Sequence, residues 1–183
     1  MARNVEIKAR VEDLAALEAL AAALADQGPI AIAQDDTFFH CAHGRLKLRR
    51  FAATQGELIF YRRADALGPK ESFYLRTPTA EPDALRDLLA AAHGISGRVI
   101  KQRTLYLAGR TRIHLDRVQG LGSFMELEVV LADDEPTAAG LQEAQALMAR
   151  LGIAPGQLVE GAYADLLAQV SAPGRPAASC SAP

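Results

Sequence analysis

Apolar and charged residues alternate one by one through much of this 183-residue chain, and the alternation limits the folds that the chain can adopt. In residues 3–11, for example, Val5 and Ile7 alternate with Glu6 and Lys8. A period of two indicates a strand with one apolar face. The segments read as strands are residues 3–11, 30–40, 45–51, 57–63, 70–77, 98–107, 111–118 and 121–131. The sequence therefore predicts eight β-strands.

Glycine-containing turns separate several of these strands, such as Ala42-His43-Gly44 and Ala108-Gly109-Arg110. Connections this short join antiparallel neighbours as hairpins. Three other segments place leucines at helical spacing, and Asp13 precedes the first of them as a candidate N-cap. These segments are residues 13–26, 82–92 and 137–151, and a short helical piece follows at 163–170. We therefore expect an α+β protein built on an antiparallel sheet.

The polar face of the strands is sorted by charge. Lysines and arginines dominate this face in the middle strands, and carboxylates are found on the first strand and the last two. Each strand alone fits a sheet with one solvated face. Taken together, the sorting and the three helices available to cover the apolar face favour a closed barrel. The predicted fold is an eight-stranded antiparallel β-barrel with a charged interior and helices packed outside.

A charged interior predicts a ligand. Charges inside a barrel are costly unless they are paired or a ligand fills the space between them. More cations than carboxylates point inward, so a polyanion is expected, and lysine and arginine bind phosphate oxygens well. The carboxylates would repel a polyphosphate unless divalent metal ions such as Mg²⁺ or Mn²⁺ lay between them. The interior therefore predicts a site for a polyphosphate and a metal.

Several motifs in this chain resemble those of one known family. They are Asn4-Val5-Glu6-Ile7-Lys8, Asp36-Thr37-Phe38-Phe39, Arg45-Leu46-Lys47-Leu48-Arg49, Leu58-Ile59-Phe60-Tyr61-Arg62-Arg63 and the run from His114 to Glu128. In this order they are similar to the CYTH superfamily, the triphosphate tunnel metalloenzymes that include class IV adenylate cyclases and thiamine triphosphatases. The resemblance extends from about residue 3 to residue 167.

The resemblance implies roles for individual residues. It implies metal ligation by Glu6, Asp116, Glu126 and Glu128, phosphate contacts from Lys8, Lys47, Arg49, Arg63, Lys101 and Arg103, and catalytic roles for Glu6, Lys8, Glu126 and Glu128. Two positions depart from the family pattern. Asn4 stands where the first acid of the E-x-E-x-K signature is expected, and Glu160-Gly161-Ala162, rather than a basic residue, precede Tyr163.

These features predict a metal-dependent enzyme that hydrolyses an inorganic or organic triphosphate inside the barrel. The same site would suit a class IV-type adenylate cyclase that converts ATP to cyclic AMP and pyrophosphate, and a non-catalytic polyphosphate or nucleotide binder is a third interpretation. His114 is either a proton carrier or a hydrogen-bonded barrel histidine. Tyr61 and Tyr74 either stack on a ring of the substrate or fill the barrel, and Lys70 and Arg76 either touch the substrate or form salt bridges at the rim.

The remaining expectations concern the setting of the protein. A net charge of −2 gives no reason to expect nucleic-acid binding, and no apolar run reaches the length of a membrane span. Two cysteines and an N-terminus without room for a signal peptide favour a cytoplasmic protein, either a monomer or a homodimer. We expect one domain over residues 1–170 and a disordered tail over 171–183.

Overall fold

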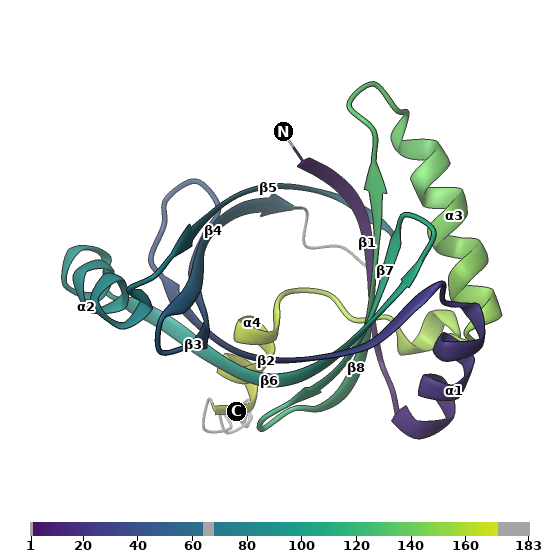
Figure 1. Ribbon diagram of the computed structural model, residues 1–183, viewed down its shortest axis with the longest axis horizontal. Coiled ribbons are helices and arrows are strands. Elements are labelled where there is room, and N and C mark those ends of the chain that lie inside the picture. The colour runs from purple at the N-terminus through teal and green to yellow at the C-terminus, as the bar shows by residue number, and fades with distance from the viewer. Residues whose placement is uncertain (1, 64–67, 172–183) are drawn as a thin grey trace, which may run out of the picture.

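The computed structural model describes residues 2–63 and 68–171, and within them eight antiparallel strands close into a ring (Figure 1). The strands are β1 (Ala2–Arg10), β2 (Gln27–Phe39), β3 (Arg45–Ala52), β4 (Gln55–Arg63), β5 (Lys70–Thr79), β6 (Ile95–Ala108), β7 (Thr111–Val118) and β8 (Gly122–Leu131). Their order around the ring is β1-β5-β4-β3-β2-β6-β7-β8. The predicted eight-stranded antiparallel barrel is confirmed.

Three helices follow the strands that do not continue into a hairpin. Helix α1 (Leu14–Leu24) separates β1 from β2, α2 (Pro82–His93) separates β5 from β6, and α3 (Thr137–Arg150) follows β8. The predicted cap of α1 is present, because the Asp13 carboxylate accepts a hydrogen bond from the backbone N–H of Ala16 at 3.0 Å. A short 3₁₀ turn, Pro155–Gln157, precedes the last helix, α4 (Tyr163–Ser171).

Strands β2 and β6 are longer than the sequence predicted, because they begin before residues 30 and 98. Pro29 lacks an N–H group and would interrupt a regular ladder. The structure places a register irregularity between Gln27 and Ile30, so the strand continues on both sides of the proline. Pairing with β6 thus overrides the local break signal of Gly28-Pro29.

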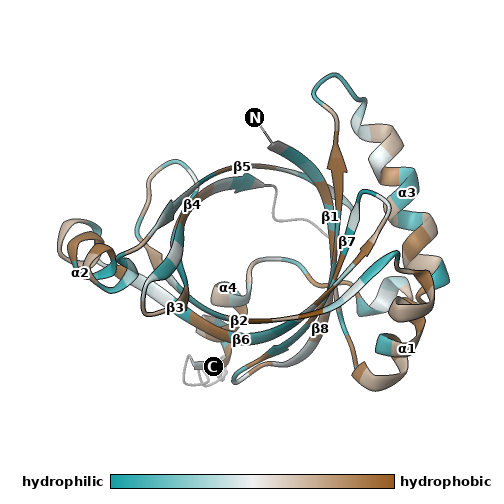
Figure 2. Cartoon of the chain, in the orientation of Figure 1, coloured by the Kyte–Doolittle hydropathy of each residue, from teal (hydrophilic) through white to brown (hydrophobic). Residues whose placement is uncertain are grey.

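Three helices cover the apolar outer face of the barrel, as predicted. Helices α1 and α3 lie on one side of the ring and α2 lies on the opposite side (Figure 1). The larger core joins Leu17 of α1 and Leu147 of α3 to outward residues of the strands such as Ile7 and Leu127. Figure 2 shows this apolar character along α1 and at the end of β8 beside α3. Leu89 of α2 forms a separate small core with outward residues of β2 and β3.

Helix α4 does not pack on the outer face. Its first residue, Tyr163, packs with the inward-facing Phe38, Val99 and Phe124 near one end of the barrel, and in Figure 1 α4 begins inside the ring and continues across β2 and β6. An ion pair of 2.8 Å between Asp165 and Arg45 of β3 also holds it there. The prediction that the helices pack outside therefore holds for α1 to α3, whereas α4 lies across one end of the barrel.

Two further expectations can be compared with the described residues. Ser171, the first residue of the expected tail, is the last residue of α4, and the rest of that tail, 172–183, lies outside the described residues. Among the helices that the structure describes, none is long and apolar enough to cross a membrane.

Candidate active site inside the barrel

The inward-facing side chains line a cavity of about 160 Å³, whereas a single water needs only on the order of 10–15 Å³. Strict alternation along each strand brings these side chains to one surface. Its lining includes the predicted residues Glu6, Lys8, Lys47, Arg49, Lys101, Arg103, Glu126 and Glu128. Most of the residues that the resemblance implied are therefore brought together in one place.

One buried aspartate, Asp36, pairs with two inward-facing cations of β3, Lys47 and Arg49. Asp36 of β2 is 2% exposed, and its carboxylate accepts from Lys47 Nζ at 2.8 Å and from Arg49 Nε and Nη2 at 2.7 and 2.8 Å. Burial alone would raise the pKa of Asp36, but Arg49 and Lys47 hold this pKa well below its usual value. Asp36 is therefore charged at neutral pH and fixes both cations against the wall of the cavity.

Asp116 of β7 makes the equivalent arrangement with β6. It is fully buried, accepts from Lys101 at 3.0 Å and from Arg103 at 2.6 Å, and also accepts from the Tyr163 hydroxyl at 3.0 Å. Arg103 and Lys101 keep the pKa of Asp116 low against the opposing effect of burial. Asp116 was expected to bind metal, but here it is the counter-ion of two cations and does not belong to the cavity lining.

The role of Asp36 was missed by the sequence analysis, although a signal for it exists. Alternation along β2 points the side chain of Asp36 into the barrel. Asp36 lies directly across from Arg49 in the β2–β3 ladder, just as Asp116 lies directly across from Arg103 in the β6–β7 ladder. An inward aspartate opposite a Lys-x-Arg pair is therefore visible in the sequence once the pairing of the strands is known.

Two glutamates of β8 face the cavity beside these cations. Glu126 lies 3.1 Å from Lys8 and 2.5 Å from Arg103, whereas the ion pairs of Glu128 with described residues are longer, 3.4 Å to Arg112 and 3.7 Å to His114. Burial opposes ionisation of both glutamates, but the surrounding cations lower the pKa of each. Both are therefore anionic at neutral pH, and Glu6 of β1 faces the cavity directly across from Glu128.

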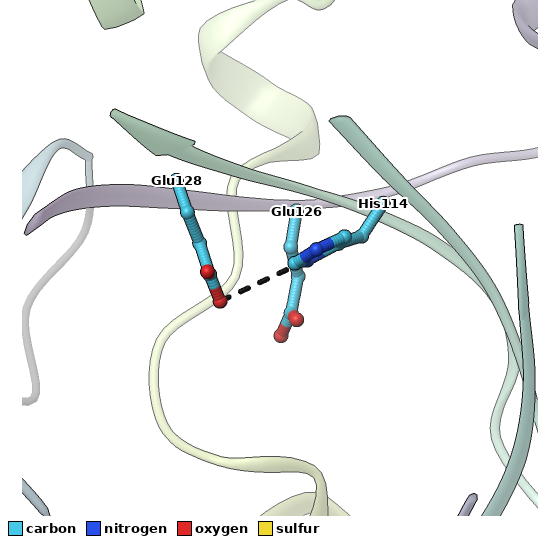
Figure 3. A group of neighbouring side chains, drawn as sticks. All are labelled: His114, Glu126 and Glu128. Carbon is cyan, nitrogen blue, oxygen red and sulfur yellow. Dashed lines mark ion pairs between the residues drawn. The ribbon is translucent and has the colours of Figure 1, made fainter. Parts of the chain in front are cut away.

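His114 projects from β7 toward the two glutamates. Figure 3 shows the three side chains converging, and ligand atoms of His114, Glu126 and Glu128 lie within 4.8 Å of one another. The imidazole side chain is 6% exposed, and burial together with the charge of Arg103 lowers its pKa to about 4. His114 is therefore neutral at neutral pH, and of the two alternatives for this residue the proton carrier is the less favoured.

Two buried polar atoms in the part of the site formed by β1, β7 and β8 lack hydrogen-bond partners among the described residues. Within residues 2–63 and 68–171, these atoms are Asn4 Oδ1 and His114 Nδ1, which belong to residues that are 3% and 4% exposed. A buried polar atom without a partner is costly. A divalent cation held by the nearby carboxylates, or its bound water, would satisfy such atoms, so the residues present fit a metal ion.

The aromatic ring of Tyr163 contacts two of the lysines that line the cavity. The Tyr163 ring lies between Lys8 and Lys101, with the two ammonium nitrogens 4.0 and 4.9 Å from its centroid. Lys8 also donates to the backbone carbonyl of Gly161 at 3.1 Å, within the segment that lacks the expected basic residue. Burial and the neighbouring Arg103 lower the pKa of Lys101 to about 8. These lysines are positioned before any anion binds.

The structure places some of the remaining candidates at the cavity. Arg76 is 55% exposed and lies 3.8 Å from Glu57, as in the salt-bridge alternative, but it also lines the cavity and so can still contact a substrate. Tyr61 and Tyr74 both line the cavity, and burial raises the pKa of Tyr61 to about 12. The side chains of Arg63 and Lys70 lie outside the described part of the chain.

The fold and the cavity together define the class of this protein, a closed β-barrel that encloses a cavity lined by paired cations and carboxylates. The chain belongs to the CYTH family, whose domain profile matches residues 2–163. It is 31% identical over 71 residues to the adenylate cyclase CyaB of Aeromonas hydrophila, and this match covers 39% of the chain and only 37% of that relative.

Solved structures show the same fold. The PH1012 protein of Pyrococcus horikoshii OT3 superimposes with a TM-score of 0.79 at 20% identity, covering 90% of this chain and 99% of that one. HpAC1 of Hippeastrum, an adenylyl cyclase candidate with a dominant triphosphatase activity, superimposes with a TM-score of 0.63 at 17% identity, covering 94% and 98%. At these identities the similarity establishes the fold alone.

Proposed function

We propose that this protein is a metal-dependent enzyme that hydrolyses a triphosphate inside its barrel. The observation that carries the proposal is the convergence of Glu6, Glu126 and Glu128 with a set of cations on one cavity, and these cations include Lys8, Lys47, Arg49, Lys101 and Arg103. Cations from three different strands can contact several phosphate groups of one chain at once. Membership of the CYTH family and the activities named for its relatives support a triphosphate as the substrate.

Substrate binding requires an exchange of partners within the site. Without ligand, Lys8 and Arg103 neutralise Glu126. A polyphosphate offers these cations new partners and leaves the carboxylate free for a metal ion. Asp36 and Asp116 would keep their cations in place during this exchange, because both are almost completely buried behind them.

Glu6, Glu126 and Glu128 are the proposed ligands of Mg²⁺ or Mn²⁺, and Asp116 is no longer included. A bound ion would shield these carboxylates from the phosphate oxygens and offset negative charge in the transition state. The lysines and arginines hold the phosphate chain for in-line attack and stabilise the charge on its oxygens. With water as the nucleophile the products are orthophosphate and a diphosphate, whereas attack by a ribose hydroxyl would give a cyclic nucleotide.

The test is product analysis with separate substrates. The protein is incubated with inorganic triphosphate, thiamine triphosphate or ATP, each with Mg²⁺ or Mn²⁺, and the products are resolved by ion-exchange chromatography. Glu126→Gln removes a proposed metal ligand, and Glu57→Gln is the matched control because Glu57 lines the same cavity near its rim.

We expect orthophosphate from the wild type and from Glu57→Gln, and its loss in Glu126→Gln. Detection of cyclic AMP and pyrophosphate would instead identify the reaction as that of an adenylate cyclase. A triphosphate that raises the melting temperature without yielding any product would make the barrel a binding protein and would overturn the proposal.

A further inference from the structure

We propose that His114 Nδ1 is a direct metal ligand, so that the metal centre of this protein is a mixed nitrogen and oxygen site formed with Glu126 and Glu128. The inference rests on the metal requirement of the proposed function. It adds a ligand from β7, and it assigns the site a preference among divalent ions.

The geometry of the three side chains supports a shared ion. His114 lies directly across from Glu126 in the β7–β8 ladder, and its Nδ1 is 3.7 Å from Glu128 Oε1 (Figure 3). All three ligand atoms lie within 4.8 Å of one another. An octahedral ion with bonds of about 2.1 Å separates its ligands by about 3.0 to 4.2 Å. Small side-chain movements would therefore bring all three atoms into coordination.

The environment of His114 gives a second reason. Its side chain is buried, its Nδ1 has no hydrogen-bond partner among the described residues, and it faces two carboxylates. A histidine serving the core would place this nitrogen against a donor or an acceptor. An ion between the imidazole and the carboxylates would satisfy the nitrogen and reduce the repulsion between the glutamates.

Asn4 gives an independent indication that the ligand set of this chain is unusual. Its Oδ1 is also buried without a hydrogen-bond partner in the described ranges, and the side chain lines the same cavity. An amide contributes an oxygen but no charge, so β1 supplies one anionic ligand fewer than two acids would. A nitrogen ligand from β7 would restore part of the metal affinity that a second acid on β1 would otherwise provide.

The nature of the ligands determines which ion is preferred. Carboxylate and carbonyl oxygens suit Mg²⁺ and Mn²⁺, whereas imidazole favours first-row transition ions. Mg²⁺ also gives up its water reluctantly. We therefore expect Mn²⁺ to bind more tightly than Mg²⁺ and the difference to depend on His114.

The test uses tag-free full-length protein with Mn²⁺ as the probe. Electron spin echo envelope modulation of bound Mn²⁺ detects a directly coordinated imidazole through its nitrogen coupling. The Mn²⁺ and Mg²⁺ affinities are measured by titration calorimetry. His114→Gln removes the nitrogen ligand, and His93→Gln is the matched control because His93 lies exposed at the end of α2.

We expect nitrogen coupling in the wild type and in His93→Gln, and none in His114→Gln. The Mn²⁺ affinity should fall by about tenfold or more in His114→Gln, with a smaller change for Mg²⁺. Bound Mn²⁺ without nitrogen coupling in the wild type would overturn the assignment of His114 while metal-dependent hydrolysis still stood. Failure to bind either ion, with no triphosphate turnover, would instead overturn the proposed function.

Discussion

Asp36 accepts hydrogen bonds from both Nε and Nη2 of Arg49, at 2.7 and 2.8 Å, and Asp116 accepts in the same way from Arg103, at 2.6 Å for both nitrogens. One arrangement spans β2 and β3, and the other spans β6 and β7. Since β2 and β6 are neighbours, the two lie close together in the ring. Each paired guanidinium is held in one orientation with part of its edge toward the cavity.

Asp36→Asn should strongly destabilise the fold, because it leaves Lys47 and Arg49 without their buried counter-ion. Removing one partner of a buried ion pair costs about 3–5 kcal/mol. In a protein of this size that corresponds to a fall in melting temperature of about 6–20 °C, measured by thermal unfolding. Asp35→Asn is the control, since Asp35 pairs with the 58%-exposed Arg98 and should cost less than about 1 kcal/mol. Equal losses in the two variants would contradict the role assigned to Asp36.

The affinity for inorganic triphosphate should depend on pH through Lys101. The free-state pKa of Lys101 is lowered to about 8 by burial and by Arg103, and a bound polyanion would raise it. The affinity for inorganic triphosphate is therefore highest below pH 8 and falls above it, by up to about tenfold per pH unit for one linked proton. Titration calorimetry between pH 7 and 9.5 at constant ionic strength measures this decrease. Lys101→Arg keeps the charge throughout and should flatten the decrease, and a constant wild-type affinity would refute the linkage.

Asn4→Glu should increase the affinity for Mg²⁺. It adds a carboxylate where the structure has a buried amide oxygen without a hydrogen-bond partner among the described residues. Asn4→Gln matches glutamate in size but brings no charge, and it separates the effect of charge from that of side-chain length. We expect a gain of about tenfold or more in Mg²⁺ affinity for the glutamate variant alone, by titration calorimetry. If neither metal affinity nor turnover rises, position 4 does not face the metal.

Glu126→Gln should lower kcat for triphosphate hydrolysis by on the order of 10²–10³. The variant loses a metal ligand and also leaves Lys8 and Arg103 with a neutral neighbour. Free of their carboxylate, these cations should bind inorganic triphosphate at least as tightly as before when no metal is present. Steady-state kinetics and metal-free titrations measure the two effects. A decrease in metal-free affinity would show that Glu126 positions the cations instead of competing for them.

The barrel and its interior could be predicted because alternation assigns each strand residue to one of two faces. That rule placed Lys47, Arg49, Lys101 and Arg103 on the same inner surface, where the structure has them. Alternation does not say which strands are neighbours. The ring order places β1 between β5 and β8, and so it determines that Lys8 meets Glu126.

The parts that could not be predicted depend on contacts between distant segments. Asp116 was expected to bind metal because its motif resembles that of the family, but its depth in the wall and its pairing with Arg103 are properties of the folded barrel. The short helix at Tyr163 has an apolar side that fits either face of a sheet. Its position at the end of the barrel follows from the contacts of Tyr163 with Asp116 and of Asp165 with Arg45.

Helix α4 has a consequence for the shape of acceptable substrates. Its first residue, Tyr163, packs among inward-facing residues near one end of the barrel, whereas Arg76 and Glu57 lie toward the other rim. Under the proposed function we therefore expect a phosphate chain to enter terminus first from the rim of Arg76 and Glu57, with any attached organic group nearer the mouth. Such an approach would favour free chain ends over internal segments, and the released phosphate would leave by the same rim.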